Sequence, residues 1–247
     1  MHHRSTAMQL RSLALAALLA TSFAAQADTV ALWDYNPTPT TTKHTVSANG
    51  ASFATLGVTT TFAGGSAYQG AAAGQALNTT GYAAQGAGDL TRGVQFMVDT
   101  SGYTDLVLTF SQRNSNTASA WTMLQYTVDG STWLNATTFQ MPSASATTFV
   151  NGLTFDFSGV ELANNNADFG FRFVATFAPG TSAYAPTAAG QTYATTGTIR
   201  YDNVLLSGTA IPDVPVDPLP VPEPQTYALM LAGLATVGLL ARRRRVG

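Results

Sequence analysis

The feature that most constrains the fold is a period-two alternation of apolar and polar residues between positions 28 and 207. Such alternation places every second side chain on one face, as in a β-strand that is buried on one side. Clusters of Gly, Asn, Ser and Asp bound the alternating runs, and long helical periodicity is absent from them. The runs predict strands at 30–35, 94–98, 106–110, 122–128, 153–157, 169–177 and 198–206.

Strands that follow one another without intervening helices predict an all-β fold, an antiparallel β-sandwich of the jelly-roll kind, over residues 28–208. Asp129-Gly130 predicts a hairpin turn, because both residues tolerate positive φ. The Thr-, Gly- and Ala-rich stretch 38–89 predicts weak strands joined by long loops, and a short helix or turn is expected near 161–165. About 180 residues suffice for one core without disulfides, and the chain has no cysteine.

The first 27 residues have the order of a secretory signal peptide. Arg4 and Arg11 precede an apolar run at 13–20, and the small residues Ala25 and Ala27 follow it. We therefore expect export through the Sec translocon and cleavage by signal peptidase after Ala27.

Residues 209–224 predict an extended linker, since six prolines between Ile211 and Pro224 block helix and sheet hydrogen bonds. Residues 225–241 contain no charge and predict a transmembrane helix, although its length of about 25 Å is slightly short for a bilayer core of about 30 Å. The arginine-rich segment 242–247 is expected to stay cytoplasmic, because arginines stop translocation. The four stop-transfer residues are Arg242, Arg243, Arg244 and Arg245.

The sequence Pro222-Glu223-Pro224, followed by the apolar segment and the arginine cluster, resembles the PEP-CTERM sorting signal of Gram-negative bacteria. The resemblance covers the tail alone. It implies that an exosortase, a membrane-embedded cysteine protease or transpeptidase, cuts near this tripeptide. It further implies an inner-membrane-anchored precursor, a mature form that is secreted or lies at the exterior of the cell envelope, and a bacterium that makes exopolysaccharide.

Charge excludes one class of partner. Between Asp28 and Ser207 there are five Lys and Arg against ten Asp and Glu, so the net charge is 5 − 10 = −5. Surfaces that bind nucleic acid are basic. We therefore expect no nucleic-acid partner.

Few residues suit catalysis. His44 is the single histidine after position 27, and no Gly-x-Ser-x-Gly elbow accompanies it, so Ser-His-Asp hydrolysis is not expected. Two carboxylate pairs, Asp99 with Asp105 and Asp156 with Glu161, are the candidates for glycan hydrolysis. The first pair has the sequence context of turns and Asp156 alternates outward, so we expect no enzyme, no catalytic residue and no cofactor.

Calcium is the one ion that the residue types accommodate, because it takes oxygen ligands. The candidates are Asp34, Asp168, Asp202, Asn203 and the run 164–166. No spaced calcium loop is present, and the alternative is that Asp202 accepts hydrogen bonds from loop N–H groups or pairs with Arg113 or Arg200.

Aromatic residues offer a second ligand class, since sugar C–H groups pack on rings. The candidates are Trp121, Trp133, Tyr103, Tyr184 and Tyr193. In addition, the run from Arg200 to Val204 is similar to the last strand of carbohydrate-binding jelly rolls. The leading expectation is a non-catalytic cell-surface or matrix protein associated with exopolysaccharide. The alternatives are a carbohydrate-binding module, with or without calcium, and a glycan hydrolase.

Overall fold

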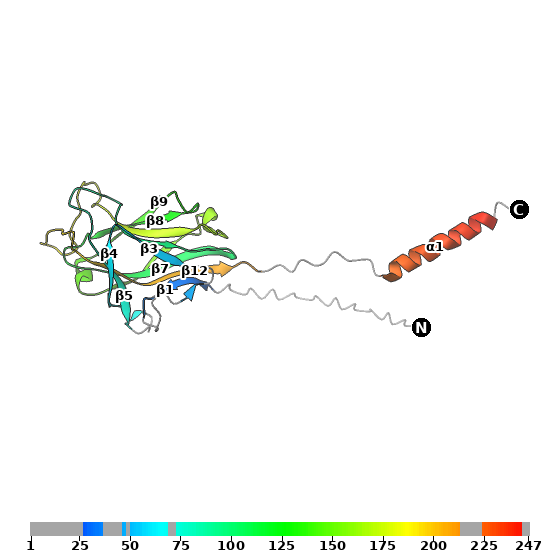
Figure 1. Ribbon diagram of the computed structural model, residues 1–247, viewed down its shortest axis with the longest axis horizontal. Coiled ribbons are helices and arrows are strands. Elements are labelled where there is room, and N and C mark those ends of the chain that lie inside the picture. The colour runs from blue at the N-terminus through cyan, green and yellow to red at the C-terminus, as the bar shows by residue number, and fades with distance from the viewer. Residues whose placement is uncertain (1–26, 37–45, 48–49, 69–72, 213–223, 244–247) are drawn as a thin grey trace, which may run out of the picture. The chain divides into compact units, whose positions relative to one another are not determined.

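The computed structural model describes residues 27–36, 46–47, 50–68, 73–212 and 224–243. They divide into two compact units, with the boundary between Ile211 and Pro212. Figure 1 shows strands in the first unit and one helix in the second.

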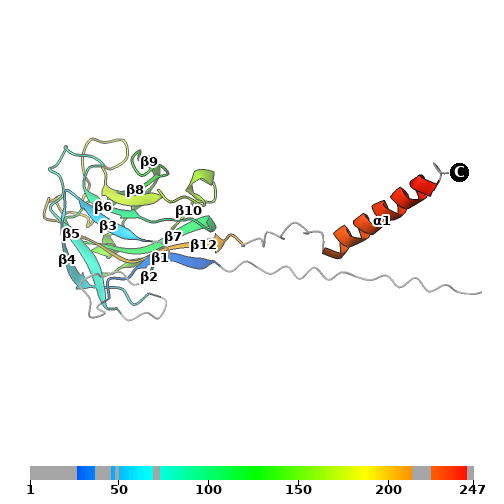
Figure 2. The ribbon, with the colours of Figure 1, turned by 45° about the vertical axis from the view of Figure 1, so that its right-hand side comes forward.

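The first unit holds two antiparallel sheets (Figure 2). The larger sheet contains β1 (Asp28–Trp33), β2 (Val46–Ser47), β4 (Thr59–Gly64), β5 (Gln75–Thr80), β7 (Tyr103–Asn114), β10 (Val150–Asp156) and β12 (Ile199–Ala210). Its order is β10-β7-β12-β1-β2, and β5 pairs with both β12 and β4. The smaller sheet, ordered β3-β6-β11-β8-β9, contains β3 (Ser52–Leu56), β6 (Gly93–Met97), β8 (Trp121–Thr127), β9 (Leu134–Gln140) and β11 (Gly170–Ala175). Two short 3-10 helices, η2 (Ser143–Ala146) and η3 (Glu161–Ala163), lie in the connections.

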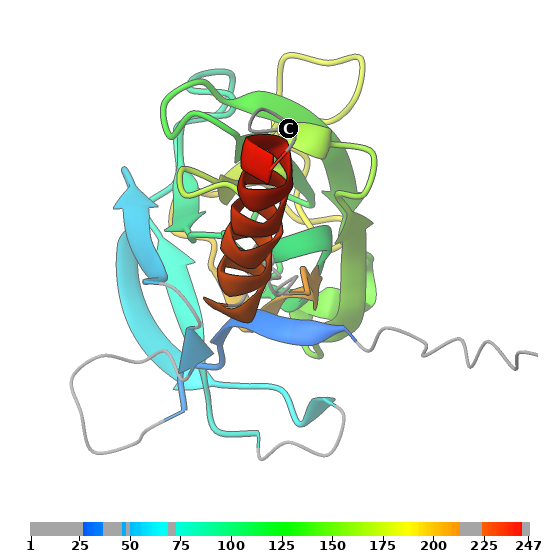
Figure 3. The same cartoon turned by 90° about the vertical axis from the view of Figure 1, so that its right-hand side faces the viewer.

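The sheets, which Figure 3 shows from one end, pack around an aromatic core. Phe96 and Phe171 of the smaller sheet stack with their ring centroids 5.0 Å apart. Phe173, also from β11, stacks on Tyr201 of β12 at 4.9 Å. Because neighbours in one core come from both sheets, the unit is a β-sandwich, as the alternation predicts. Its jelly-roll connectivity stays a prediction.

Each of the seven predicted strands is present, but β7 is longer than expected. The prediction ended at Phe110, whereas the strand continues to Asn114. Gln112 and Asn114 are buried polar residues, and the Gln112 amide donates to Asn114 Oδ1 at 2.9 Å and to Thr122 Oγ1 at 3.0 Å. These hydrogen bonds offset much of the cost of burying the two amides, although Gln112 Oε1 is buried without a partner among the described residues. The strand therefore continues where its sequence turns polar.

The stretch 38–89 contains more regular structure than expected. Strands β4 and β5 pair over six residues each, from Thr59 opposite Thr80 to Gly64 opposite Gln75. The backbone ladder forms although the side chains are mostly Thr, Ala and Asn. Strand β9 was also missed, because an edge strand with one exposed face need not be apolar.

The predicted hairpin joins β8 and β9. Gly130 has φ of 72°, and the Asp129 carboxylate accepts backbone hydrogen bonds from Ser131 at 2.8 Å and Thr132 at 2.6 Å. The loop is longer than a two-residue turn, because Tyr126 pairs with Leu134. The expected short helix near 161–165 is η3.

The boundaries of the tail differ slightly from those predicted. Strand β12 runs to Ala210, two residues beyond the predicted domain end at 208, and Ile211 N donates to Gly102 O at 2.7 Å. Helix α1 (Pro224–Arg243) begins at the last residue of the predicted linker. Proline suits a first helical turn, where an N–H has no partner.

Several features predicted for the two ends of the chain are not confirmed or lie outside the described residues. Within the described part of the chain, no helix is long and apolar enough to cross a membrane, so the transmembrane prediction for 225–241 is not confirmed. Pro222, Glu223, Arg244 and Arg245 lie outside the described residues. The predicted signal peptide also lies outside them, except Ala27, and so does His44.

Candidate ligand-binding face

The outer face of the smaller sheet carries a row of polar side chains. Strands of this sheet alternate between core residues, such as Phe171 and Phe173, and residues that point away from the core. The register aligns one outward residue from each of the five strands. From β3 to β9 this row begins with Ala54 and continues with four polar residues, Gln95, Arg172, Gln125 and Asn135; it is called the polar row below.

Hydrogen bonds hold the polar row in place. Arg172 Nε donates to Gln125 Oε1 at 2.6 Å, and Gln125 Nε2 donates to Asn135 Oδ1, also at 2.6 Å. The Arg172 guanidinium lies over the ring of Trp133, with Cζ 4.3 Å from the ring centroid. Partial burial lowers the pKa of Arg172, but an arginine stays charged at neutral pH. The row therefore presents a fixed cation beside neutral amides.

Two tryptophans lie at this face. Trp133 follows the hairpin and is half-buried beneath Arg172. Trp121, also half-buried, begins β8 and shares the outer face with Gln125, four residues further on. At about 3.3 Å per residue, Trp121 lies about 13 Å along the strand from Gln125. The face therefore combines ring surface with hydrogen-bonding groups over the length of a short oligosaccharide.

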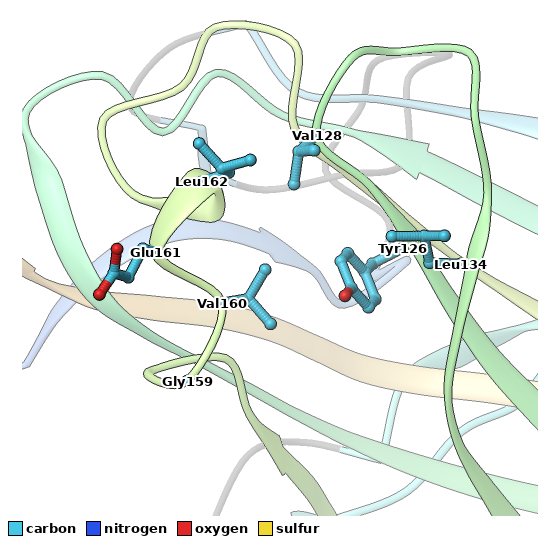
Figure 4. A pocket seen from close by; sticks show the side chains of 7 residues that line it. All are labelled: Tyr126, Val128, Leu134, Gly159, Val160, Glu161 and Leu162. Carbon is cyan, nitrogen blue, oxygen red and sulfur yellow. The ribbon is translucent and has the colours of Figure 1, made fainter.

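A separate pocket of about 330 Å³ opens beside η3. Its lining is mainly aliphatic: Tyr126, Val128, Leu134, Gly159, Val160, Glu161 and Leu162. Figure 4 shows Val160 turned toward Tyr126, while Glu161 points away from Tyr126. Leu162 is 71% exposed and Leu134 46%. The pocket offers apolar surface but few converging polar groups.

The predicted carboxylate pairs do not form a catalytic arrangement. Asp99 accepts a backbone hydrogen bond from Ser101 at 2.8 Å, and Asp156 accepts one from Ser158 at 2.7 Å. The pKa of Asp99 is lowered by hydrogen bonds from the side chain and backbone of Ser101, and that of Asp156 by hydrogen bonds from the backbone and side chain of Ser158. A lowered pKa is the opposite of what a general acid needs. Asp105 is exposed, and Glu161 is the one carboxylate that lines the pocket.

The candidate calcium ligands separate into two places. Asp202 is buried, and its oxygens accept from Ser66 N at 2.7 Å and Asn203 N at 2.8 Å. These bonds match the alternative to calcium binding that the sequence offered, in which Asp202 accepts hydrogen bonds from loop N–H groups. Asp34 is near enough to raise the pKa of Asp202.

The other candidates lie near the loop before β7. Asn165 Oδ1 accepts from Gly102 N at 2.9 Å, and Asn166 Oδ1 accepts from Asp168 N at 2.7 Å. Among the described residues, no three His, Cys, Asp or Glu side chains gather closely enough to hold a metal ion. The structure therefore does not bring the predicted ligands into one site.

Two of the five predicted sugar-stacking aromatics are buried, which corrects that expectation. Tyr184 is 2% exposed and Tyr193 is 8% exposed, and their rings stack at 4.6 Å. Their hydroxyls donate to Gly88 O at 2.8 Å and Ala83 O at 2.7 Å. These side chains fasten the 178–197 loop to the sandwich. Tyr103 is half-buried and packs against the core.

Sequence reasoning did not single out Arg172, Gln125 or Gln95. The available signal was local, because Arg172 alternates with Phe171 and Phe173 and so must point outward. Their alignment into one row depends on pairings between strands far apart in sequence. That alignment is visible only in the folded sheet.

The comparisons with known proteins identify the sorting signal. The model of the PEP-CTERM protein-sorting motif matches residues 220–245. The chain therefore carries a PEP-CTERM motif, as the resemblance around Pro222-Glu223-Pro224 implies, and this motif marks an exported protein of the cell envelope that an exosortase processes. No curated protein matches the sequence.

Two solved structures resemble the chain distantly. One is the CBM22-1 xylan-binding domain of Xyn10C from Paenibacillus barcinonensis, with 15% identity, a TM-score of 0.44 and coverage of 75% of this chain and 97% of that chain. The other holds the CBM22-1 and GH10 modules of Clostridium thermocellum xylanase Xyn10B with xylohexaose, at 7% identity, a TM-score of 0.41 and coverage of 78% of this chain and 30% of that chain. Likenesses this distant carry no information about a ligand.

Proposed function

We propose that this protein is a non-catalytic, exported polysaccharide-binding protein of the cell envelope, and that its ligand is exopolysaccharide outside the cell. The observation that carries the proposal is the polar row together with Trp133, whose ring lies against Arg172 in the middle of the row. The PEP-CTERM motif supports the location, because it places the sandwich among exported proteins.

The chemistry of the face suits a sugar polymer. The amides of Gln95, which is half-buried, and Asn135, which is exposed, can both donate and accept hydrogen bonds, as sugar hydroxyls do. Ring surface from Trp121 and Trp133 suits the C–H faces of a sugar. The row crosses all five strands of the sheet, so it can contact several units of a long sugar chain.

The polar row is also organised before any ligand binds. Gln125 is 5% exposed and is held between Arg172 and Asn135 by two hydrogen bonds of 2.6 Å. Side chains fixed in advance lose little conformational entropy on binding. This supports a binding role, since a merely solvated surface has no need of linked side chains.

The proposal is of a non-catalytic protein because the carboxyl groups do not meet the requirements of glycoside hydrolysis. Glycoside hydrolysis needs two carboxyl groups on either side of the bond, one of them with a raised pKa. Asp99 and Asp156 have lowered pKa values. Burial raises the pKa of Asp202 to about 6, but this carboxylate is 2% exposed and its oxygens are bound to the N–H groups of Ser66 and Asn203. The polar row itself contains no carboxylate.

Replacing Trp133 by alanine tests the proposal. We expect Trp133→Ala to weaken binding about tenfold, because it removes ring surface and releases Arg172. The measurement is retardation of the full chain in native gels that contain polygalacturonate, alginate, arabinoxylan or barley β-glucan.

Tyr68→Ala is the matched control, since Tyr68 is a half-buried aromatic that lies against Gly152 of the larger sheet. It should bind as the wild type does. Wild-type protein that none of the four polymers retards, or a Trp133→Ala variant that is retarded equally, would contradict the proposal.

A further inference from the structure

Arg172 is the sole charged residue in three successive rows of the outer face. The rows on either side of the polar row are given by the same register. They hold Leu56, Gly93, Val174, Met123 and Thr138 on one side, and Ser52, Met97, Gly170 and Thr127 on the other. These rows therefore contain one charged residue, a cation, and the carboxylate of Asp129 accepts from Thr127 Oγ1 at 3.0 Å at the edge of the neighbouring row.

The charge of Arg172 is only partly used within the protein. Its Nε donates to Gln125 and its plane rests on Trp133, while neither Nη has an acceptor among the described residues. Burial is the cause of its lowered pKa, with no contribution from a carboxylate. A partly desolvated cation without a counter-ion costs free energy, which an anionic ligand would offset.

The other arginines of the sandwich have structural partners. Arg92 Nη1 donates to Gly57 O and Gly81 O, each at 2.6 Å. Arg200 donates to Asn78 Oδ1 and Gly64 O, each at 3.2 Å. These bonds tie loops and strands together. Arg172 differs because the end of its guanidinium that carries the two Nη groups is left for something outside the chain.

We propose that the polymer bound at this face is acidic, and that a sugar carboxylate binds end-on to the two Nη groups of Arg172. The inference rests on the proposed polysaccharide-binding function and adds the chemical class of the ligand. With Nε occupied by Gln125, the end-on fork is the remaining bidentate geometry for a carboxylate. Trp133 holds the guanidinium plane, so the fork is oriented before the polymer arrives.

The preference for an acidic polymer cannot come from the overall charge of the sandwich. Residues 28–207 carry a net charge of 5 − 10 = −5, so long-range electrostatics do not attract a polyanion. Tight binding of an acidic polymer must then come from a specific contact. Arg172 provides one place for such a contact, because no carboxylate contributes to the shift in its pKa.

The experiment compares two polymers that differ in the carboxylate alone: polygalacturonate and the same polymer after chemical reduction of its carboxyl groups to alcohols. Binding of the full chain to each is measured by calorimetry. We expect the wild type to bind the acidic polymer about tenfold or more tightly than the reduced one, as a charge-assisted bidentate bond predicts.

Variants at Arg172 locate the selectivity. Arg172→Gln should bind both polymers equally, at the level of the wild type with the reduced polymer. Arg172→Lys keeps the charge but loses the fork, and should retain an intermediate preference. Arg113→Gln is the matched control. It removes the same charge from the larger sheet, where Arg113 of β7 lies opposite Arg200 of β12 in the strand register. Circular dichroism checks that each variant is folded.

Four outcomes would overturn the inference. Equal binding of both polymers by the wild type would reject the acidic ligand but leave the polysaccharide-binding function intact. An Arg172→Gln variant that keeps the full preference, or an Arg113→Gln variant that loses it, would show that the selectivity lies elsewhere. Binding of neither polymer would overturn it too. The polysaccharide-binding function itself then depends on the wider gel panel.

Discussion

Replacing Phe173 by alanine is expected to lower the free energy of unfolding of the sandwich by about 3–5 kcal/mol. Phe173 is fully buried and joins the two layers. Its ring lies 4.4 Å from that of Phe110 and 4.9 Å from that of Tyr201, both in the larger sheet. Because rings from both sheets surround it, the cavity cannot close by movement of one side chain.

The loss is a large share of the stability of a typical domain, roughly 5–15 kcal/mol. Denaturant unfolding followed by circular dichroism measures it. The control is Phe155→Ala, since Phe155 is half-buried on the edge strand β10 and should cost clearly less. Equal losses for the two variants would mean that Phe173 does not join the layers as described.

Stability is also expected to rise as the pH falls from 7 toward 4, because of Asp202. Burial is the main cause that raises the pKa of this carboxyl from 3.8 to about 6, and Asp34 adds to it. Hydrogen bonds from Ser66 and Asn203 act in the opposite direction without cancelling the effect. Among the described residues, no cation neutralises the buried charge.

The sign follows from proton binding. The folded pKa lies above the unfolded value, so the folded state binds the proton more tightly between about pH 4 and 6. The stabilising contribution is present below the unfolded pKa and is lost as the pH rises through 6. Its size is on the order of 1–3 kcal/mol.

Urea unfolding of the wild type and Asp202→Asn at pH 4.5 to 7.5 isolates this contribution. Exposed carboxyl groups, such as Asp99 and Asp156, titrate equally in both proteins, so the difference between the two curves belongs to Asp202. We expect the free energy of the wild type, relative to the variant, to fall as the pH rises. A difference that stays constant with pH would show that Asp202 has an ordinary pKa.

The strands were predictable where their pattern is local. Phe169, Phe171 and Phe173 alternate within one segment, and all three are fully buried as expected. The extension of β7 was not predictable, because Gln112 is satisfied in part by Thr122 on another strand. The burial of Tyr184 was missed for the same reason, since its hydroxyl partner, Gly88, lies 96 residues away.

The candidate site was predictable only in part. Tryptophan at 121 and 133 indicated ring surface for sugars, and both residues lie at the outer face. The importance of Arg172 could not be inferred from its neighbours in sequence, because its role comes from Gln125, 47 residues away, and from a ring on the hairpin. A binding face that spans five strands depends on their register, which period-two alternation does not specify.

The most direct test of the polysaccharide-binding face is nuclear magnetic resonance of the isotope-labelled protein during titration with oligosaccharides from the best-retained polymer. We expect the indole N–H of Trp133 and the Nε–H of Arg172 to shift most, while the indole of the buried Trp33 stays unchanged. Shifts confined to Tyr126 and Leu162 around the pocket, or no shifts at all, would contradict a binding site on the outer face.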